Sequence, residues 1–216
     1  MVEDEGLNGL DAFAAPRKRM LERDIRRRGV TATPILTAMG KVPRHLFVPP
    51  DLRSSAYDDR ALPIGGGQTI SQPYIVARMI ALAAVGADSK VLDVGTGSGY
   101  AAAVLAEIVD EVVTIEVRPD LAAEAAGRLT ELGYGNVVVH TGDARRLELG
   151  LFDAILVAAA ATDVPPGLED QLAEGGRLVI PLGGRMSQRL WVIERQENQL
   201  VREAHEAVAF VPLIEE

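Results

Sequence analysis

The part of the sequence after residue 85 alternates short apolar runs with helical patterns, and this alternation narrows the choice of fold more than any other feature. The apolar runs predict strands over Lys90–Gly95, Glu111–Glu116, Asn136–Asp143 and Phe152–Ala160. Helical patterns over Ser98–Glu107 and Pro119–Leu132 separate the first three runs, and Gly133 follows the second helix as a stop signal. Strand-helix-strand units of this kind build a parallel sheet, so we expect an α/β fold.

The two ends of the chain depart from this pattern. Three more apolar runs, at residues 175–183, 189–196 and 207–213, have no clear helix between the last two, which predicts an antiparallel edge. Before residue 85 we expect a basic helix over about residues 15–29, a short helix begun by Thr33 and Pro34, and a helix over about residues 72–84. We therefore expect one domain over residues 1–216, with a helical cap and substrate segment (about 1–85) on a cofactor-binding core (86–216).

Composition excludes several classes of site. The chain has no cysteine, so a thiolate nucleophile, a disulfide and a Cys-based zinc site are impossible. The three histidines lack metal-ligand spacing, and we expect no bound metal. The N-terminal residues have neither a basic region nor an apolar core, and the longest apolar run, Ala154–Ala161, is far short of a membrane span. We expect a cytoplasmic monomer with no membrane partner.

One basic run stands out against the overall acidity. Residues 17–28 (RKRMLERDIRRR) hold seven basic and two acidic side chains, whereas the net charge of the chain is −9. Such a run is usually the solvated face of a helix, although it could also contact phosphates. Because the net charge repels nucleic acid, we expect no nucleic-acid partner.

A glycine-rich loop follows the first predicted strand of the core. Gly95-Thr96-Gly97-Ser98-Gly99 lies between a strand and a helix, where glycine lets a ligand approach the backbone closely. The loop does not identify the ligand by itself, because Gly97 to Ala102 also fits the dinucleotide pattern G-x-G-x-x-A.

Acidic residues stand at three strand ends around this loop. Glu116 ends the second strand, where its carboxylate can accept hydrogen bonds from ribose hydroxyls in either NAD or S-adenosylmethionine. Asp143 follows the third strand, where it could accept a bond from an adenine amino group, although a lone Asp there is often a turn residue. Asp93 lies at the end of the first strand. Together with the loop, these residues resemble the class I S-adenosylmethionine-dependent methyltransferases, which implies a Rossmann-like, doubly wound sheet of seven mostly parallel strands with an antiparallel C-terminal edge.

Longer stretches, the most specific of them before the core, narrow the resemblance to one family. The stretches VPRHLFVP (42–49), AYDDRALPIGGGQTISQPYIVARM (56–79), VLDVGTGSGYAAAVLA (91–106), GGRLVIPLG (175–183) and FVPL (210–213) are similar to those of the protein-L-isoaspartate (D-aspartate) O-methyltransferases. The most specific element is Gln68-Thr69-Ile70-Ser71. Asp93 departs from the family in standing where many members have Glu, which gives a shorter arm toward the amino group of the cofactor.

The resemblance implies both a reaction and a set of site residues. Members transfer a methyl group from S-adenosylmethionine to the α-carboxyl of L-isoaspartyl residues in damaged proteins, and the ester then closes to a succinimide that can reopen as aspartate. By family position Ser71 is the active-site hydroxyl. The implied cofactor contacts are Gln68, Thr69, Ile70, Asp93, Gly95, Thr96, Gly97, Ser98, Glu116, Asp143 and Ala144.

The expected chemistry needs no general base, because a carboxylate is already ionised at pH 7. Ser71 also precedes Gln72 and Pro73 and could simply be the N-cap of the next helix, a role that is compatible with catalysis. Two other functions stay open at this point. One is an RNA methyltransferase of related fold that uses the basic run, and the other is a module that binds peptide or S-adenosylmethionine without turnover.

Overall fold

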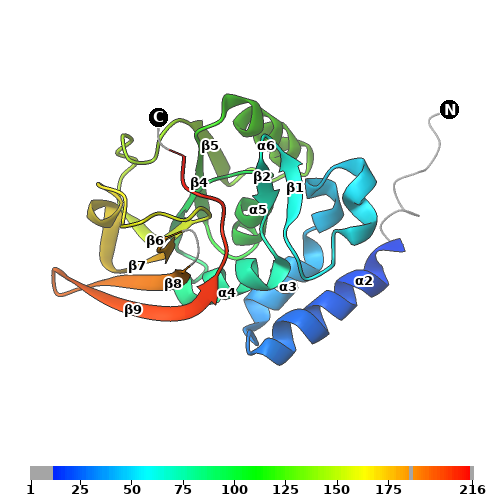
Figure 1. The fold of residues 1–216 in the computed structure, drawn as a ribbon, viewed down its shortest axis with the longest axis horizontal. Helices are drawn as coiled ribbons and strands as arrows, with labels where there is room; N and C mark the ends of the chain where they lie inside the picture. The colour runs from blue at the N-terminus through cyan, green and yellow to red at the C-terminus, as the bar shows by residue number, and fades with distance from the viewer. Residues whose placement is uncertain (1–11, 185–186, 215–216) are drawn as a thin grey trace.

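The structure is a computed structural model and describes residues 12–184 and 187–214. Its centre is a seven-stranded sheet in the order β5-β4-β3-β6-β7-β8-β9, with a two-stranded hairpin, β1-β2, beside it (Figure 1). The strands of the large sheet are β3 (Lys90–Val94), β4 (Glu111–Glu116), β5 (Val137–Thr141), β6 (Phe152–Val157), β7 (Leu172–Leu182), β8 (Gln188–Gln196) and β9 (Gln199–Val208).

The first five strands of this sheet are parallel. The chain passes from β3 outward through β4 to β5 and then returns to the other side of β3, where β6 pairs with it. The order of the strands therefore reverses between β3 and β6. In open α/β sheets, ligands bind beyond the carboxyl ends of the strands at such a reversal.

The C-terminal strands form the predicted antiparallel edge. β8 is antiparallel to both β7 and β9, and Glu197 and Asn198 join β8 to β9 with φ of 50° and 64°, as tight hairpins require. The last strand lies at Gln199–Val208, so the prediction of a strand over residues 207–213 was wrong in position. Pro212 lacks a backbone N–H and so is unfavourable within a strand. The actual edge strand is mostly polar and exposed, so the search for apolar runs did not find it.

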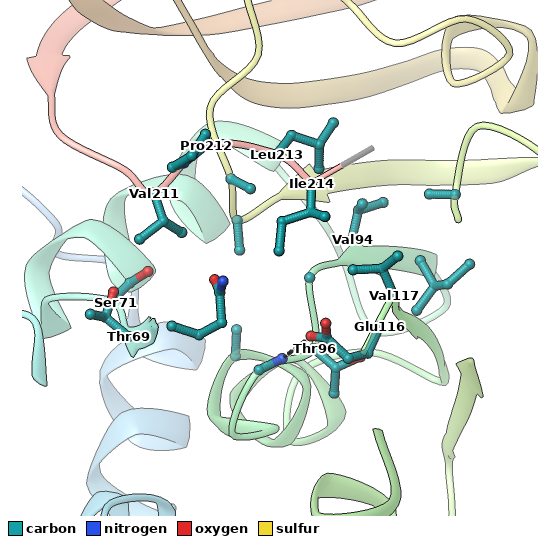
Figure 2. Close-up of a pocket in the computed structure, with 18 of the residues that line it drawn as sticks. Thr69, Ser71, Val94, Thr96, Glu116, Val117, Val211, Pro212, Leu213 and Ile214 are labelled. Atoms are coloured by element: carbon teal, nitrogen blue, oxygen red, sulfur yellow. Dashed lines mark hydrogen bonds between the residues drawn. The ribbon is translucent and has the colours of Figure 1, made fainter. Parts of the chain in front are cut away.

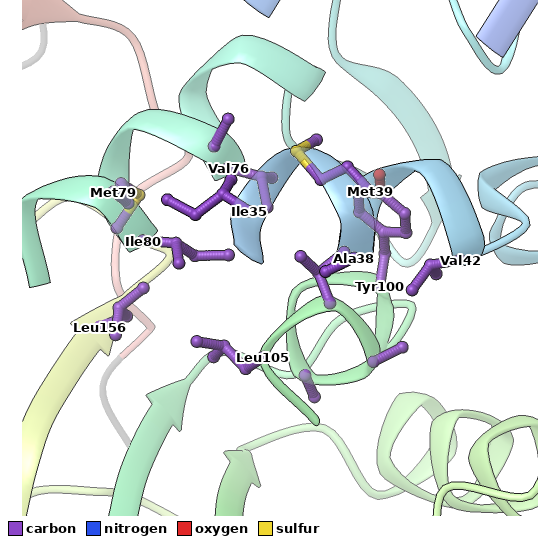
Figure 3. Packing of buried hydrophobic residues seen from close by; sticks show 14 of the residues in the cluster. Ile35, Ala38, Met39, Val42, Val76, Met79, Ile80, Tyr100, Leu105 and Leu156 are labelled. Atoms are coloured by element: carbon purple, nitrogen blue, oxygen red, sulfur yellow. The ribbon is translucent and has the colours of Figure 1, made fainter. Parts of the chain in front are cut away.

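The helices gather on one face of the sheet. They are α3 (Thr33–Lys41), α4 (Pro73–Ala83), α5 (Tyr100–Ala106) and α6 (Pro119–Glu131). Residues of α3, α4 and α5 share one hydrophobic cluster with β3, β6 and β7, which includes Ile35, Met39, Ile80, Leu105 and Leu156 (Figure 3). The opposite face, around Ile155 and Ile180, is covered by residues of the loops at 142–151 and 158–171, in which the short 3-10 helix η5 (Glu169–Gln171) lies.

The N-terminal cap packs into the same cluster as the core. It contains α2 (Ala14–Arg19), the π-helical turn η1 (Met20–Ile25), the 3-10 helices η2 (Arg26–Arg28), η3 (Arg44–Phe47) and η4 (Pro50–Ser55), α3, and the hairpin of β1 (Leu62–Gly65) and β2 (Gln68–Ile70). The basic helix predicted over residues 15–29 is thus divided into α, π and 3-10 segments, and it ends at Gly29 with φ of 97°. Thr33 is the first residue of α3, whereas the cap position is Ala32.

No helix in the described part of the chain combines the length and the apolar character that crossing a bilayer requires.

Candidate active site

A pocket opens at the carboxyl ends of β3, β4 and β5, between the glycine-rich loop, the β1-β2 hairpin and the C-terminal segment. It encloses about 930 Å³, counting the space at its open mouth. Figure 2 shows Thr69 and Ser71 on one side, Thr96 and Glu116 on another, and Val211 to Ile214 along a third. All of the predicted site residues line this pocket except Asp93.

The glycine-rich loop reaches the pocket through a left-handed turn. Gly97 has φ of 52°, which favours glycine, and a Cβ there would lie 3.3 Å from Cδ1 of Ile64 in the hairpin. Backbone N–H groups of Gly95 and Thr96 donate to the carbonyl oxygen of Ile115 at 2.8 and 3.2 Å. The loop is therefore tied to the end of β4 and leaves room for the hairpin and for a ligand between them.

Glu116 is buried at the end of β4 and ties two backbone segments together. Its Oε2 accepts a hydrogen bond from the N–H of Gly97 at 2.8 Å, and its Oε1 accepts one from the N–H of Arg118 at 3.1 Å. Each carboxylate oxygen has a second lone pair, so this side chain can still accept hydrogen bonds from the two hydroxyls of a ribose.

Asp93 is the one predicted cofactor contact that does not line the pocket, and its contact with the cofactor stays a prediction. It is buried beneath the loop, where the hydroxyl of Thr114 donates to its Oδ2 at 3.0 Å, and Thr114 in turn lies 2.6 Å from the hydroxyl of Thr96. Burial raises the pKa of Asp93 to about 7, and the Thr114 hydrogen bond partly opposes that increase. Asp93 thus supports the loop through two threonines.

Asp143 lines the pocket next to Ala144, already joined to an arginine. The Arg145 guanidinium holds the Asp143 carboxylate through Nη2 at 2.6 Å and Nε at 3.0 Å. This pairing lowers the pKa of Asp143, so the carboxylate stays ionised. An adenine amino group at this position would share the carboxylate with Arg145, a pocket residue that sequence reasoning missed although it lies two positions along the chain.

Gly66, at the turn of the hairpin, lies close to the residues that follow β4. Gly66 has φ of 57°, and a Cβ there would lie 2.8 Å from Cζ of Arg118, two residues beyond Glu116. A side chain at this turn would be strained by the positive φ, and the Arg118 guanidinium would have to shift to make room for it. The hairpin therefore lies against both the glycine-rich loop and the residues after β4, and it holds Gln68, Thr69, Ile70 and Ser71 over the pocket.

Ser71 precedes α4 but is not its N-cap. The cap position is Gln72, whose own side chain does not cap the helix. Asp59 does so from the cap segment, because its Oδ1 accepts the N–H of Tyr74 at 3.2 Å and its Oδ2 accepts Nε2 of Gln72 at 2.7 Å. The interpretation of Ser71 as an ordinary N-cap is therefore wrong, and its hydroxyl is not used for that purpose.

The C-terminal segment forms a wall that we did not predict. Val211 to Ile214 line the pocket, and the segment is fixed by hydrogen bonds to Ala160, whose N–H donates to the Val211 carbonyl and whose carbonyl accepts the Leu213 N–H, both at 2.8 Å. Val117, Pro165 and Leu168 add further apolar surface. The stretch FVPL belonged to the family resemblance, but only its position in the folded chain shows it at the pocket.

A second groove meets the pocket at Ser71. It is lined by Thr69, Ser71, Gln72 and Tyr74 on one side and by residues 206–211 on the other. Thr69, Ser71, Ala158 and Val211 line both the groove and the pocket. Ser71 therefore stands where a chain lying in the groove would meet a ligand held in the pocket.

Comparison with known proteins agrees with this geometry. The family model described as protein-L-isoaspartate (D-aspartate) O-methyltransferase matches residues 15–216. Protein-L-isoaspartate O-methyltransferase of Roseiflexus castenholzii is 52% identical over 204 residues, which are 94% of this chain and 93% of that protein. The Vibrio cholerae protein of the same name is 49% identical over 94% of this chain and 98% of its own.

A solved structure is similar over almost the whole fold. It is a candidate protein-L-isoaspartate O-methyltransferase from Plasmodium falciparum in complex with S-adenosyl-L-homocysteine, with a TM-score of 0.79 and 28% identity over 93% of this chain and 99% of that chain. With the family model and the curated relatives, it leads to one conclusion. The chain belongs to the protein-L-isoaspartate (D-aspartate) O-methyltransferase family.

Proposed function

We propose that the pocket and the groove divide the reaction of this family between them, with Ser71 at their junction. As a member of the family, the chain is an S-adenosylmethionine-dependent enzyme that methylates the α-carboxyl of L-isoaspartyl residues in damaged proteins and peptides. The observation that carries the assignment of roles is that Ser71 and Thr69 line both cavities, whereas Glu116 and the glycine-rich loop line the pocket and not the groove.

The residues of the pocket suit the cofactor. Glu116 retains lone pairs for ribose hydroxyls, Asp143 is an ionised acceptor for an adenine amino group, and the absence of a side chain at Gly97 leaves the loop accessible. We assign the cofactor to Gln68, Thr69, Ile70, Gly95, Thr96, Gly97, Ser98, Glu116, Asp143 and Ala144. When bound, S-adenosylmethionine supplies an electrophilic methyl group on a sulfonium.

Ser71 is proposed to hold the acceptor. The α-carboxylate of an isoaspartyl residue is ionised at neutral pH, so no residue has to remove a proton from it. The Ser71 hydroxyl can donate one hydrogen bond to one carboxylate oxygen, while the other oxygen remains free to attack. A neutral donor orients the nucleophile without the stronger charge neutralisation that Lys or Arg would impose. The stretch from Leu62 to Tyr74 contains neither.

The apolar walls contribute by excluding water. Val211 to Ile214, Ile70 and Val94 surround the region between Ser71 and the loop. Removing water from an anionic nucleophile strengthens its reaction with a cationic methyl donor, because solvation would stabilise the separated charges. Positioning supplies the rest, since a well-oriented bound pair is worth roughly 7 to 11 kcal/mol of activation free energy.

Repair then follows without further catalysis. Methylation turns the α-carboxylate into an ester, whose methoxy group is a far better leaving group than the oxide of a carboxylate. The neighbouring backbone nitrogen attacks the ester carbonyl, the C–OCH3 bond breaks, and the group leaves as methanol with the proton from that nitrogen. The resulting succinimide can be hydrolysed to normal aspartate. The enzyme therefore has to recognise only the misplaced carboxylate and the adjoining backbone.

A methyl-transfer assay tests this proposal. Purified chain with methyl-labelled S-adenosylmethionine should label an isoaspartyl peptide and leave the matched aspartyl peptide unlabelled, and the label should be lost in base as an ester would be. Equal labelling of both peptides, or an inactive chain beside an active control enzyme, would contradict the assignment. A peptide that binds without turnover would favour the non-catalytic alternative.

We further propose that the chain acts as a single-domain, cytoplasmic monomer without a nucleic-acid partner. The cap and the core share one hydrophobic cluster, which supports a single domain. Internal contacts engage much of the basic run: Arg17 binds Tyr57 and the Gly40 carbonyl, and Arg28 pairs with Asp59. Sedimentation of the purified chain and RNA binding at low salt would test the oligomeric state and the nucleic-acid prediction.

A further inference from the structure

Arg44 is a fully buried arginine that bonds the peptide of Ser71. Its Nη2 donates to the carbonyl oxygen of Ser71 at 2.7 Å, and its Nε donates to the carbonyl oxygen of Ala56, also at 2.7 Å. The side chain has 0% exposure. One rigid, planar group thus joins two backbone segments that lie far apart in the sequence, and one of them carries the proposed active-site hydroxyl.

The same guanidinium contacts Tyr100, which lies directly after the glycine-rich loop. Its Cζ lies 4.6 Å from the ring centroid of Tyr100, a cation–π contact. Tyr100 begins α5 directly after the glycine-rich loop and lines the pocket. Arg44 therefore contacts both the loop end that we assign to the methyl donor and the backbone of the residue that we assign to the acceptor.

Burying this cation has a cost. Burial lowers the pKa of Arg44, which shows that the cation pays a desolvation penalty in this position. Its described hydrogen bonds go to neutral carbonyl oxygens, which offset that penalty less than a carboxylate would. A planar fork of N–H donors reaches both carbonyls at once, so the arginine fixes the two backbone segments in one geometry.

We infer that Arg44 is a positioning residue for methyl transfer: it fixes the Ser71 peptide relative to Tyr100 and the glycine-rich loop, and so sets the distance and angle between acceptor and donor. The inference rests on the role proposed for Ser71. In-line displacement is sensitive to such placement, and an error of about 1 Å can cost about 100-fold in rate.

The test compares two arginine-to-lysine variants. Arg44→Lys keeps the charge but replaces the planar fork by one ammonium, which cannot hold the same geometry at both carbonyls and over the ring. We expect kcat to fall about 100-fold, while the Kd for S-adenosylhomocysteine changes less than about threefold. Arg17→Lys is the matched control, because Arg17 also links segments of the cap, through Tyr57 and the Gly40 carbonyl, without contacting Ser71. Its kcat should stay within about threefold of wild type.

Chemical rescue gives a readout that a purely structural role would not move. In Arg44→Ala, millimolar guanidinium should restore part of kcat, whereas the same concentration of sodium chloride should not. The rescue is measured under conditions in which circular dichroism and S-adenosylhomocysteine binding show Arg44→Ala to be folded, and absence of rescue there overturns the inference. Unchanged kcat in Arg44→Lys, or parallel losses of kcat and cofactor binding in both lysine variants, would also overturn it. An inactive wild-type chain would remove the role of Ser71 and this inference together.

Discussion

The two walls of the active site are built in different ways. The cofactor wall consists of Gly95–Ser98, Glu116 and Asp143, which follow three successive strands and are held by hydrogen bonds to neighbouring strand ends. The acceptor wall consists of Ser71 and the groove beside it, and it adjoins the β1-β2 hairpin, whose Gln68, Thr69 and Ile70 we assign to the cofactor. Side chains from elsewhere in the chain, Arg44 and Asp59, hold Ser71 and the start of α4. The first wall is a product of the sheet, whereas the second depends on packing between the cap and the core.

This difference has a consequence for mutation. Changes in the cofactor wall should alter cofactor affinity or the stability of the sheet, because the donors and acceptors there belong to β3, β4 and their loops. Changes at Ser71 and at the side chains that hold it should alter the rate of methyl transfer with little effect on cofactor affinity. Substitutions at Asp93, Glu116, Ser71 and Asp59, in order of decreasing expected effect, test that separation.

The pH dependence of stability at Asp93 tests whether the buried carboxyl group supports the glycine-rich loop from within the sheet. Its folded-state pKa of about 7 lies above the usual value of 3.8, so the folded protein binds the extra proton between those pH values. The contribution of Asp93 to stability is present below pH 3.8 and is lost as the pH rises through about 7, a change on the order of 4 kcal/mol. Asp93→Asn should lack this contribution.

Urea unfolding of the wild type and Asp93→Asn at several pH values between 4 and 8 measures the effect as a difference between the two proteins. As the pH rises, the unfolding free energy of the wild type should fall relative to that of Asp93→Asn. The exposed Asp110→Asn serves as the control and should follow the wild type. A pH-independent difference between wild type and Asp93→Asn would show that Asp93 is ionised in the folded protein throughout this range.

Glu116→Gln should weaken cofactor binding by about 1.5 to 3 kcal/mol, the range for a hydrogen bond to a charged group. The amide retains one acceptor oxygen, so it cannot hold both the Gly97 N–H and the Arg118 N–H while also accepting from a ribose. Calorimetric titration with S-adenosylhomocysteine measures the loss. Glu111→Gln, at the other end of β4, is the matched control, and equal affinities of the two variants would exclude Glu116 from the cofactor site.

The same division explains what the sequence could and could not predict. The parallel strands and the positions of Gly97, Glu116 and Asp143 were predictable, because apolar runs and strand ends are local features. The hydrogen bond that joins Asp93 to Thr114 was not, since only the folded sheet places Thr114 beside it. Contacts that bring Arg44, Asp59 and Val211 to the site join residues far apart in the chain, and no local pattern marks them.

Ser71→Ala should lower kcat/KM for an isoaspartyl peptide about tenfold, because it removes one hydrogen bond to a charged acceptor. Cofactor affinity should change less than about twofold, since Ser71 belongs to the acceptor wall. Steady-state kinetics with the peptide and calorimetry with S-adenosylhomocysteine separate the two quantities. Ser54→Ala, an exposed serine of the cap, provides the control. If Ser71→Ala lost affinity for S-adenosylhomocysteine and kept its kcat, Ser71 would be a cofactor contact and not a residue that holds the acceptor.

Asp59→Ala should have the smallest effect, a loss of about 1 kcal/mol in unfolding free energy, which is typical for removing a helix cap. The first turn of α4 loses the acceptor for the Tyr74 N–H, and the Gln72 side chain loses its anchor. Because Ser71 directly precedes that turn, kcat should also fall a few-fold while cofactor affinity is kept. The neighbouring Asp58→Ala removes a carboxylate that pairs with Arg60 at 3.6 Å and lies outside this network, so it should leave both quantities unchanged. If Asp59→Ala lowered stability without changing kcat, the start of α4 would not govern the placement of Ser71, and the acceptor wall would depend on Arg44 and the hairpin alone.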